Sequence, residues 1–173
     1  MIFKLIEPTL EMGKEYNNYI SEWEESGEEI VPYASRRTNV GYNDLINCWK
    51  DQATTIAYKE GFVPASLYFL IDENMRIYGA LHIRYELNDY LLNYGGHIGY
   101  GIRQCERKKG YATKMLSLAL PIVKKIGIKK ALVTCDKENI ASAKTILNNG
   151  GVLENEVIEC GEVTQRYWIN MVN

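Results

Sequence analysis

The sequence has few of the residues on which metal centres and disulfide-rich folds depend. Only 4 of its 173 residues are cysteines and 2 are histidines, and no two cysteines stand in C-x-x-C spacing. This composition excludes a disulfide framework, a structural zinc site of the common spacings and a multi-histidine centre. We therefore expect free thiols and no bound metal.

Net charge of one sign and long apolar runs are also missing. Twenty basic side chains stand against 22 acidic ones, a net charge of −2, so no overall field attracts nucleic acid or an anionic membrane. No apolar run reaches the roughly 20 residues of a membrane-spanning helix, and the first residues lack the layout of a signal peptide. We expect a cytoplasmic protein with neither a nucleic-acid nor a membrane partner.

What is present is the composition of a folded domain. Hydrophobic residues make up 46% and charged residues 24%, and the length predicts a single domain over residues 1–173. Apolar residues that alternate predict strands, and apolar residues spaced by three and four predict helices. The expected strands are 1–7, 65–72, 77–86, 96–102, 131–135, 152–159 and 163–170, and the expected helices are 10–23, 43–60, 112–126 and 139–148. This order predicts an α/β (α+β) fold with a mixed, largely antiparallel central sheet of about seven strands and helices on both faces.

The segment between the third strand and the long helix carries an electrostatic oddity. A helix N-terminus has a partial positive charge and four unpaired N–H groups, and it normally attracts acidic or capping residues. Here Arg107, Lys108 and Lys109 occupy that place. A phosphate group would satisfy both the amides and the cations, and Gly110 would let the main chain approach it closely. The alternative is an ordinary solvated run of charge.

The same residues resemble the acetyl-coenzyme A loop of the GCN5-related N-acetyltransferases, the GNAT family. The family pattern [Gln/Arg]-x-x-Gly-x-[Gly/Ala] matches Arg107-Lys-Lys-Gly110-Tyr-Ala112, which follows an expected strand and opens an expected helix. Residues 135–142 resemble the family's second cofactor segment, and the whole order of elements agrees. The resemblance implies the GNAT acyl-CoA N-acyltransferase fold, with acetyl-CoA as cosubstrate and no metal.

The resemblance also implies a set of cofactor-binding residues. The N–H groups of the loop would hold the pyrophosphate, the main chain of the preceding strand would meet the pantetheine arm, and two polar residues of the next helix would contact that arm. These residues are Ile102, Arg107, Lys108, Lys109, Gly110, Tyr111, Ala112, Asn139 and Ser142. Asn139 could instead cap its helix, and Gly99 and Gly101 could admit the pantetheine or serve local packing.

In this family an amine attacks the thioester directly in a ternary complex, an oxyanion forms and the coenzyme A thiolate leaves. Many members carry a glutamate base where this chain has His97, which could act as the base or be an ordinary strand residue. The family often has a tyrosine acid where this chain has Ile146. Tyr100, Tyr111 and solvent are the candidates for protonating the thiolate, and we take His97 and Tyr100 as the catalytic pair.

The acceptor is expected to be a primary amine, either a small molecule or a peptide. The acidic connection over residues 21–41 could be a lid that attracts a cationic amine or merely a solvated loop. Alternatives for the whole protein are a non-catalytic acyl-CoA binding or regulatory module on the same fold, and a nucleic-acid binder using Arg103 and the cations of the loop, which the net charge disfavours. The C-terminal hairpin offers edge strands for a possible homodimer.

Overall fold

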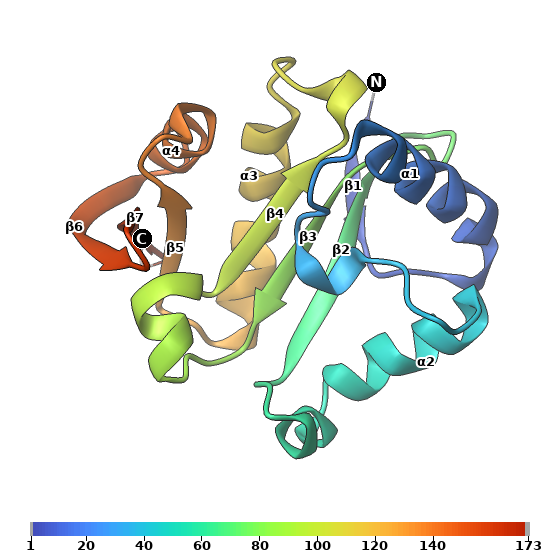
Figure 1. Cartoon of the computed structure of the whole chain (residues 1–173), viewed down its shortest axis with the longest axis horizontal. Coiled ribbons are helices and arrows are strands. Elements are labelled where there is room, and N and C mark those ends of the chain that lie inside the picture. The colour runs from blue at the N-terminus through green and yellow to red at the C-terminus, as the bar shows by residue number, and fades with distance from the viewer. Residues whose placement is uncertain (1, 172–173) are drawn as a thin grey trace.

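The computed structural model describes residues 2–171 and has the expected order of strands and helices (Figure 1). The strands are β1 (Lys4–Ile6), β2 (Ala65–Ile71), β3 (Ile77–Arg84), β4 (Ile98–Ile102), β5 (Lys130–Asp136), β6 (Gly151–Glu159) and β7 (Glu162–Asn170). The α-helices are α1 (Gly13–Ser26), α2 (Tyr42–Gln52), α3 (Tyr111–Ile126) and α4 (Ile140–Leu147).

The strands form two antiparallel sheets where the sequence predicted one. Their orders are β1-β2-β3-β4 and β5-β7-β6. The division falls between β4 and β5, which lie next to each other without forming a continuous ladder (Figure 1). The prediction of about seven largely antiparallel strands is confirmed, and the split opens a space between the two sheets.

Successive side chains of the buried strands point alternately into two hydrophobic cores, one on each face of the four-stranded sheet. In β2 every residue is buried, so both faces of the strand must be covered. Leu67 and Phe69 belong to the core under α1 and α2, whereas Tyr68 and Leu70 belong to the core under α3. Helices therefore cover both faces of the four-stranded sheet, as the sequence predicts.

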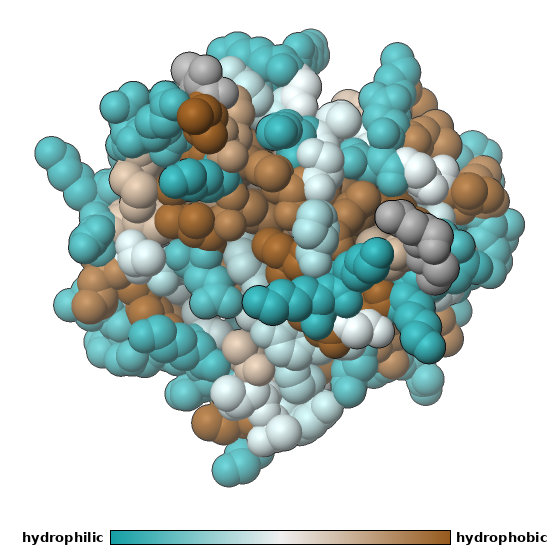
Figure 2. All heavy atoms as spheres, turned by 180° about the vertical axis from the view of Figure 1, so that it is seen from behind, coloured by the Kyte–Doolittle hydropathy of each residue, from teal (hydrophilic) through white to brown (hydrophobic). Residues whose placement is uncertain are grey.

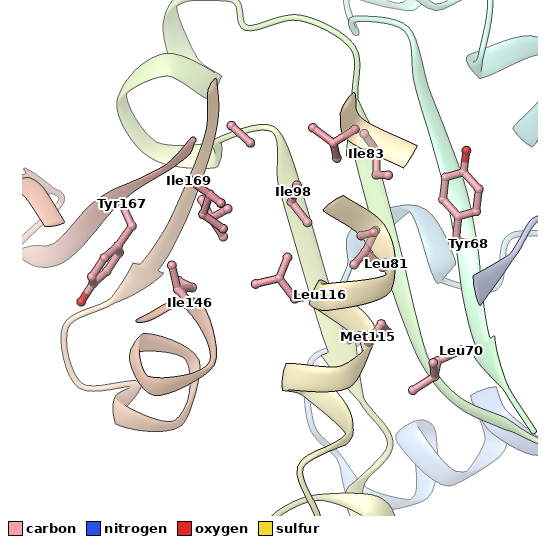
Figure 3. Packing of buried hydrophobic residues seen from close by; sticks show 14 of the residues in the cluster. Tyr68, Leu70, Leu81, Ile83, Ile98, Met115, Leu116, Ile146, Tyr167 and Ile169 are labelled. Carbon is pink, nitrogen blue, oxygen red and sulfur yellow. The ribbon is translucent and has the colours of Figure 1, made fainter. Parts of the chain in front are cut away.

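The core under α3 joins the two sheets. Met115 and Leu116 of α3 face the four-stranded sheet, and Ile146 of α4 and Ile169 of β7 enter the same cluster from the other sheet (Figure 3). This shared packing holds β4 beside β5 although they are not paired along their length. On the face behind Figure 1, where α3 lies, hydrophobic residues form a band across the upper middle that hydrophilic side chains interrupt (Figure 2).

Two stretches differ from the expected elements. The predicted helix over 43–60 ends at Gln52, and a separate 3-10 turn follows over Thr55–Glu60, where the Thr54 hydroxyl accepts from the Ile56 N–H. The expected loop over 86–96 contains a short π-helical turn, Leu91–Gly95. None of the helices within residues 2–171 has the length and hydrophobicity that a membrane span requires.

Candidate active site

The two sheets meet at the start of β4 and then separate. The His97 N–H donates to the Leu132 carbonyl of β5 at 2.7 Å, and the Arg84 N–H of β3 donates to the His97 carbonyl. At the other end of β4 the Arg103 N–H donates to the Tyr78 carbonyl of β3. Because antiparallel pairing alternates, the main-chain groups of residues 98, 100 and 102 point away from β3 and toward β5. The open edge of β4 thus presents backbone donors and acceptors to the gap.

A cavity of about 260 Å³ occupies the gap, lined by Tyr100 of β4, Cys135 of β5, and Asn139 and Ser142 at the start of α4. The Tyr100 hydroxyl lies 2.8 Å from the Ser142 Oγ. Burial raises the Tyr100 pKa to about 12, so the phenol stays protonated at neutral pH. The Asn139 Oδ1 accepts from the Ser142 N–H at 3.0 Å, so Asn139 caps α4 while bordering the cavity.

The loop that follows β4 presents unpaired amides. Lys108 and Gly110 have left-handed conformations, with φ of 62° and 82°. Alternation of right- and left-handed residues turns successive N–H groups toward one side and forms an anion-binding concavity. In the described chain the N–H groups of residues 108–110 meet no acceptor, and nothing lies within 4 Å of a Cβ built on Gly110. The first N–H groups of α3, including those of Tyr111 and Ala112, extend this set because no side chain caps the helix.

The cations of the loop are partly neutralised by the protein itself. The Arg107 guanidinium makes a two-point ion pair with Glu28, and its Nε donates to the Ile102 carbonyl at 3.0 Å. The Arg107 N–H also closes a turn onto the Gln104 carbonyl at 3.3 Å. Lys109 pairs with Glu106, which leaves Lys108 as the one loop cation without an acidic partner in the described chain.

The acidic connection therefore holds the loop in place and has little free charge for an amine. Glu22 accepts from the Arg103 Nε at 2.7 Å and from the Cys105 N–H at 3.1 Å. Arg103 is 2% exposed and also binds Glu15, so it cannot face a nucleic acid. The Arg107 hydrogen bonds lower the Glu28 pKa. These contacts tie α1 and the chain after it to the segment that starts α3.

The geometry argues against His97 as the base. Its Nδ1 accepts the Leu132 N–H at 2.9 Å, which places the remaining ring proton on Nε2, and its side chain lines neither cavity. Burial, assisted by the positive charge of Arg84, lowers the His97 pKa to about 4. The histidine therefore joins β4 to β5 as a neutral hydrogen-bond acceptor, which is the alternative that the sequence left open.

Two other expected positions serve packing. The Tyr111 ring packs against Phe3 and Tyr78, with ring centroids 5.0 Å apart in both cases, and it lines neither cavity. A Cβ on Gly101 would collide with the Val31 carbonyl oxygen, because the connection after α1 crosses β4 there. On that face Gly101 therefore admits the protein's own chain. Ile146, where the family often has tyrosine, is fully buried in the core.

A larger cavity of about 960 Å³ lies on the face of the four-stranded sheet that α2 covers. It is bordered by α2, the connection before α2 and the π-helical turn. His82 and Arg84, two residues apart on β3, both line it. Arg84 and Gly95 also line the smaller cavity, so the two spaces adjoin at these residues. Burial lowers the His82 pKa to about 3, so its imidazole is neutral. Sequence reasoning missed Arg84, for which the signal would have been a cation ending a strand whose other residues are mostly apolar.

The thiols of Cys135 and Cys105 are not activated as nucleophiles. Burial raises the pKa of the Cys135 thiol in the smaller cavity to about 11, and burial together with Glu22 raises that of Cys105. Both thiols therefore stay protonated and are weak nucleophiles. The described chain gathers no group of three or more metal-ligating side chains.

Solved structures similar to this chain include several acetyltransferases. The microcin C7 self-immunity acetyltransferase MccE, in complex with acetyl-CoA and AMP, is 19% identical with a TM-score of 0.63, and the match covers 97% of this chain and 92% of that one. The ribosomal-protein-S5-alanine acetyltransferase from Vibrio fischeri is 15% identical with a TM-score of 0.70 and the same coverages. A mutant spermidine N-acetyltransferase SpeG from Vibrio cholerae is 13% identical with a TM-score of 0.64, covering 99% and 95%.

Comparison with curated proteins finds no match. The family model described as "Acetyltransferase (GNAT) domain" matches residues 17–152, from within α1 to the start of β6. This segment contains the loop, the open strand edge and both cavities' principal walls. The chain belongs to the GNAT acetyltransferase family.

Proposed function

We propose that this protein transfers the acetyl group of acetyl-CoA directly to a primary amine. One observation carries the proposal: the open main-chain edge of β4 leads into a loop whose amides at residues 108–110 have no acceptor in the described chain. A strand edge suits the amide groups of a pantetheine arm, and a concavity of amides at a helix start suits a pyrophosphate. The two features follow each other in the order in which coenzyme A presents these groups.

In this proposal the loop binds through its main chain more than through its side chains. The amides of residues 108–112 hold the pyrophosphate, and Lys108 adds a free positive charge. Arg107 and Lys109 shape the loop through their own carboxylate partners. Ile102 offers its N–H to the pantetheine, while its carbonyl is engaged by Arg107.

The acetyl group then lies in the smaller cavity and the amine enters from the larger one. Tyr100 donates a proton or a hydrogen bond to the leaving thiolate, since its phenol is neutral and its partner, Ser142, can donate in turn. Main-chain N–H groups of β4 that face the gap stabilise the oxyanion. Asn139 keeps its amino group available to the cofactor arm while its oxygen caps α4.

The test is a thiol-release assay over a panel of primary amines, with acetyl-CoA binding measured separately by calorimetry. Release of coenzyme A that depends on an amine, with the acetylated amine identified by mass spectrometry, supports the proposal. Micromolar binding of acetyl-CoA without turnover on small amines, polyamines or peptides would favour the alternative, a non-catalytic acyl-CoA binding module. Absence of acetyl-CoA binding would exclude both.

A further inference from the structure

Arg84 is a partly buried cation without a carboxylate partner in the described chain. It makes no ion pair within the described chain, and its Nη1 donates to the main-chain carbonyls of Gly95 at 2.8 Å and Gly96 at 3.1 Å. The other arginines at the larger cavity are paired, Arg36 with Glu29 and Arg37 with Glu24. Taking a guanidinium out of water is costly unless it meets an anion or a full set of acceptors.

Arginine binds anions side-on through Nε and Nη2, and in Arg84 this edge makes no contact with a protein acceptor of the described chain. Nε and Nη2 of Arg84 have no acceptor in residues 2–171, and neither is sealed from solvent. These two nitrogens form a fork that matches the two oxygens of a carboxylate or a phosphonate. Gly99 of β4 borders the fork, since a Cβ on it would lie 3.3 Å from Nη2. The two carbonyl contacts of Nη1 brace the π-helical turn, but they give no role to Nε and Nη2.

The fork also lies where the acceptor must meet the acetyl group. Arg84 and Gly95 are the residues that line both cavities, so a molecule reaching from the larger cavity toward the smaller one passes the guanidinium. We propose that Arg84 binds an anionic group of the acceptor, so that the substrate is a primary amine with a carboxylate or phosphonate close to its nitrogen, as in a free amino acid. This inference rests on the proposed function and names its substrate class.

An anion on Arg84 would also change the charge around His82. Arg84 contributes to the low pKa of His82, which lines the same cavity. An anion on the guanidinium offsets that positive charge and raises the His82 pKa. A cationic neighbour of the amine, as in a polyamine, has the opposite effect and would be repelled by Arg84.

The test compares amines that differ only in the anionic group. Free amino acids, their phosphonate analogues, their uncharged amides and, as a polyamine control, spermidine are assayed with the full-length protein and acetyl-CoA, and their binding in the presence of coenzyme A is measured by calorimetry. Charge-assisted pairing predicts about 10- to 100-fold tighter binding and higher kcat/KM for the acids than for their amides. The phosphonate arm shows whether the fork requires a planar carboxylate. Equal or better binding of the amides or of spermidine, or binding of none of these amines, would overturn the inference.

Variants of Arg84 give a second, independent comparison. Arg84→Met removes the fork and should abolish the preference for acids, whereas Arg84→Lys keeps the charge and should retain part of it. The ratio between acid and amide is unaffected by a general loss of active protein, and acetyl-CoA binding reports folding. If acids bind selectively but no amine is acetylated, the proposed transferase activity fails while the anion site stands. If Arg84→Met keeps the full preference, the anion site fails even when turnover continues.

Discussion

The Tyr100 hydroxyl lies 2.8 Å from the Ser142 Oγ and spans the gap between β4 and α4. This contact connects the sheet that carries the proposed acetyl-CoA edge to the helix that borders the other side of the same cavity. It holds a neutral phenol at this cavity, whereas the position at which GNAT members often have a tyrosine is occupied by the buried Ile146. We propose that Tyr100 supplies the proton from this different position.

Tyr100→Phe removes the donor and little volume. We expect kcat to fall about 100-fold because the thiolate loses its acid, while acetyl-CoA binding stays close to that of the wild type. Steady-state kinetics and calorimetry measure the two effects. Tyr85→Phe is the matched control, since Tyr85 bonds to Ser66 and lines neither cavity. An unchanged kcat in Tyr100→Phe would assign the proton to solvent.

The two histidines make stability depend on pH between the ordinary histidine pKa and about 4. Burial lowers the pKa of His97 to about 4 and that of His82 to about 3, so above pH 4 the unfolded chain binds more protons than the fold. Their stabilisation is complete above pH 6.5 and is lost as the pH falls, by about 1.4 kcal/mol per pH unit for each histidine. Urea unfolding at pH 7, 6 and 5 should show the free energy of unfolding decreasing.

His97→Gln isolates one of the two contributions. The variant should show a smaller decrease of unfolding free energy between pH 7 and 5, because one titrating group is gone. Its turnover should keep the pH profile of the wild type, since His97 lines neither cavity. Loss of the acidic limb of the rate profile in this variant would restore His97 as the base.

Alanine substitution at the two glycines of β4, Gly99 and Gly101, should lower the stability of the protein by different amounts. Gly101→Ala would drive a methyl group into the Val31 carbonyl oxygen, whereas Gly99→Ala would place it 3.3 Å from the movable end of Arg84. We expect Gly101→Ala to destabilise the protein by about 1–3 kcal/mol as an overpacked site and Gly99→Ala by less. Urea unfolding of the pair measures this. Equal costs would show that the connection can move away from β4.

The sequence predicted the strands and helices more accurately than the contacts between them. The strands around Ala65–Ile71 and Ile77–Arg84 and the start of α4 at Asn139 follow from local patterns, because periodicity and capping depend on near neighbours. The pairing of Arg107 with Glu28 was out of reach, since these residues are 79 positions apart. The division between β4 and β5 was also invisible, because an apolar strand next to a gap has the same pattern as one inside a sheet.

In the functional site too, local features could be predicted from the sequence, whereas long-range contacts could not. The cationic loop and its glycine were visible because they violate the usual composition of a helix start. Arg84 was missed because its isolation from carboxylates is a property of the assembled cavity and has no local signature. His97 matched a family position, yet only the fold reveals that its Nδ1 is occupied by the Leu132 N–H.

The amides at the start of α3 form the proposed pyrophosphate site, and one pair of variants tests this assignment directly. Gly110→Asn and Gly110→Asp have nearly the same size and the same left-handed strain, and Asn tolerates that conformation well. They differ in the negative charge beside the proposed pyrophosphate. Calorimetry with acetyl-CoA should show affinity at least about 30-fold weaker for Asp than for Asn, as expected for closely placed like charges. Equal affinities would mean that the pyrophosphate binds elsewhere and would contradict the assignment of this loop.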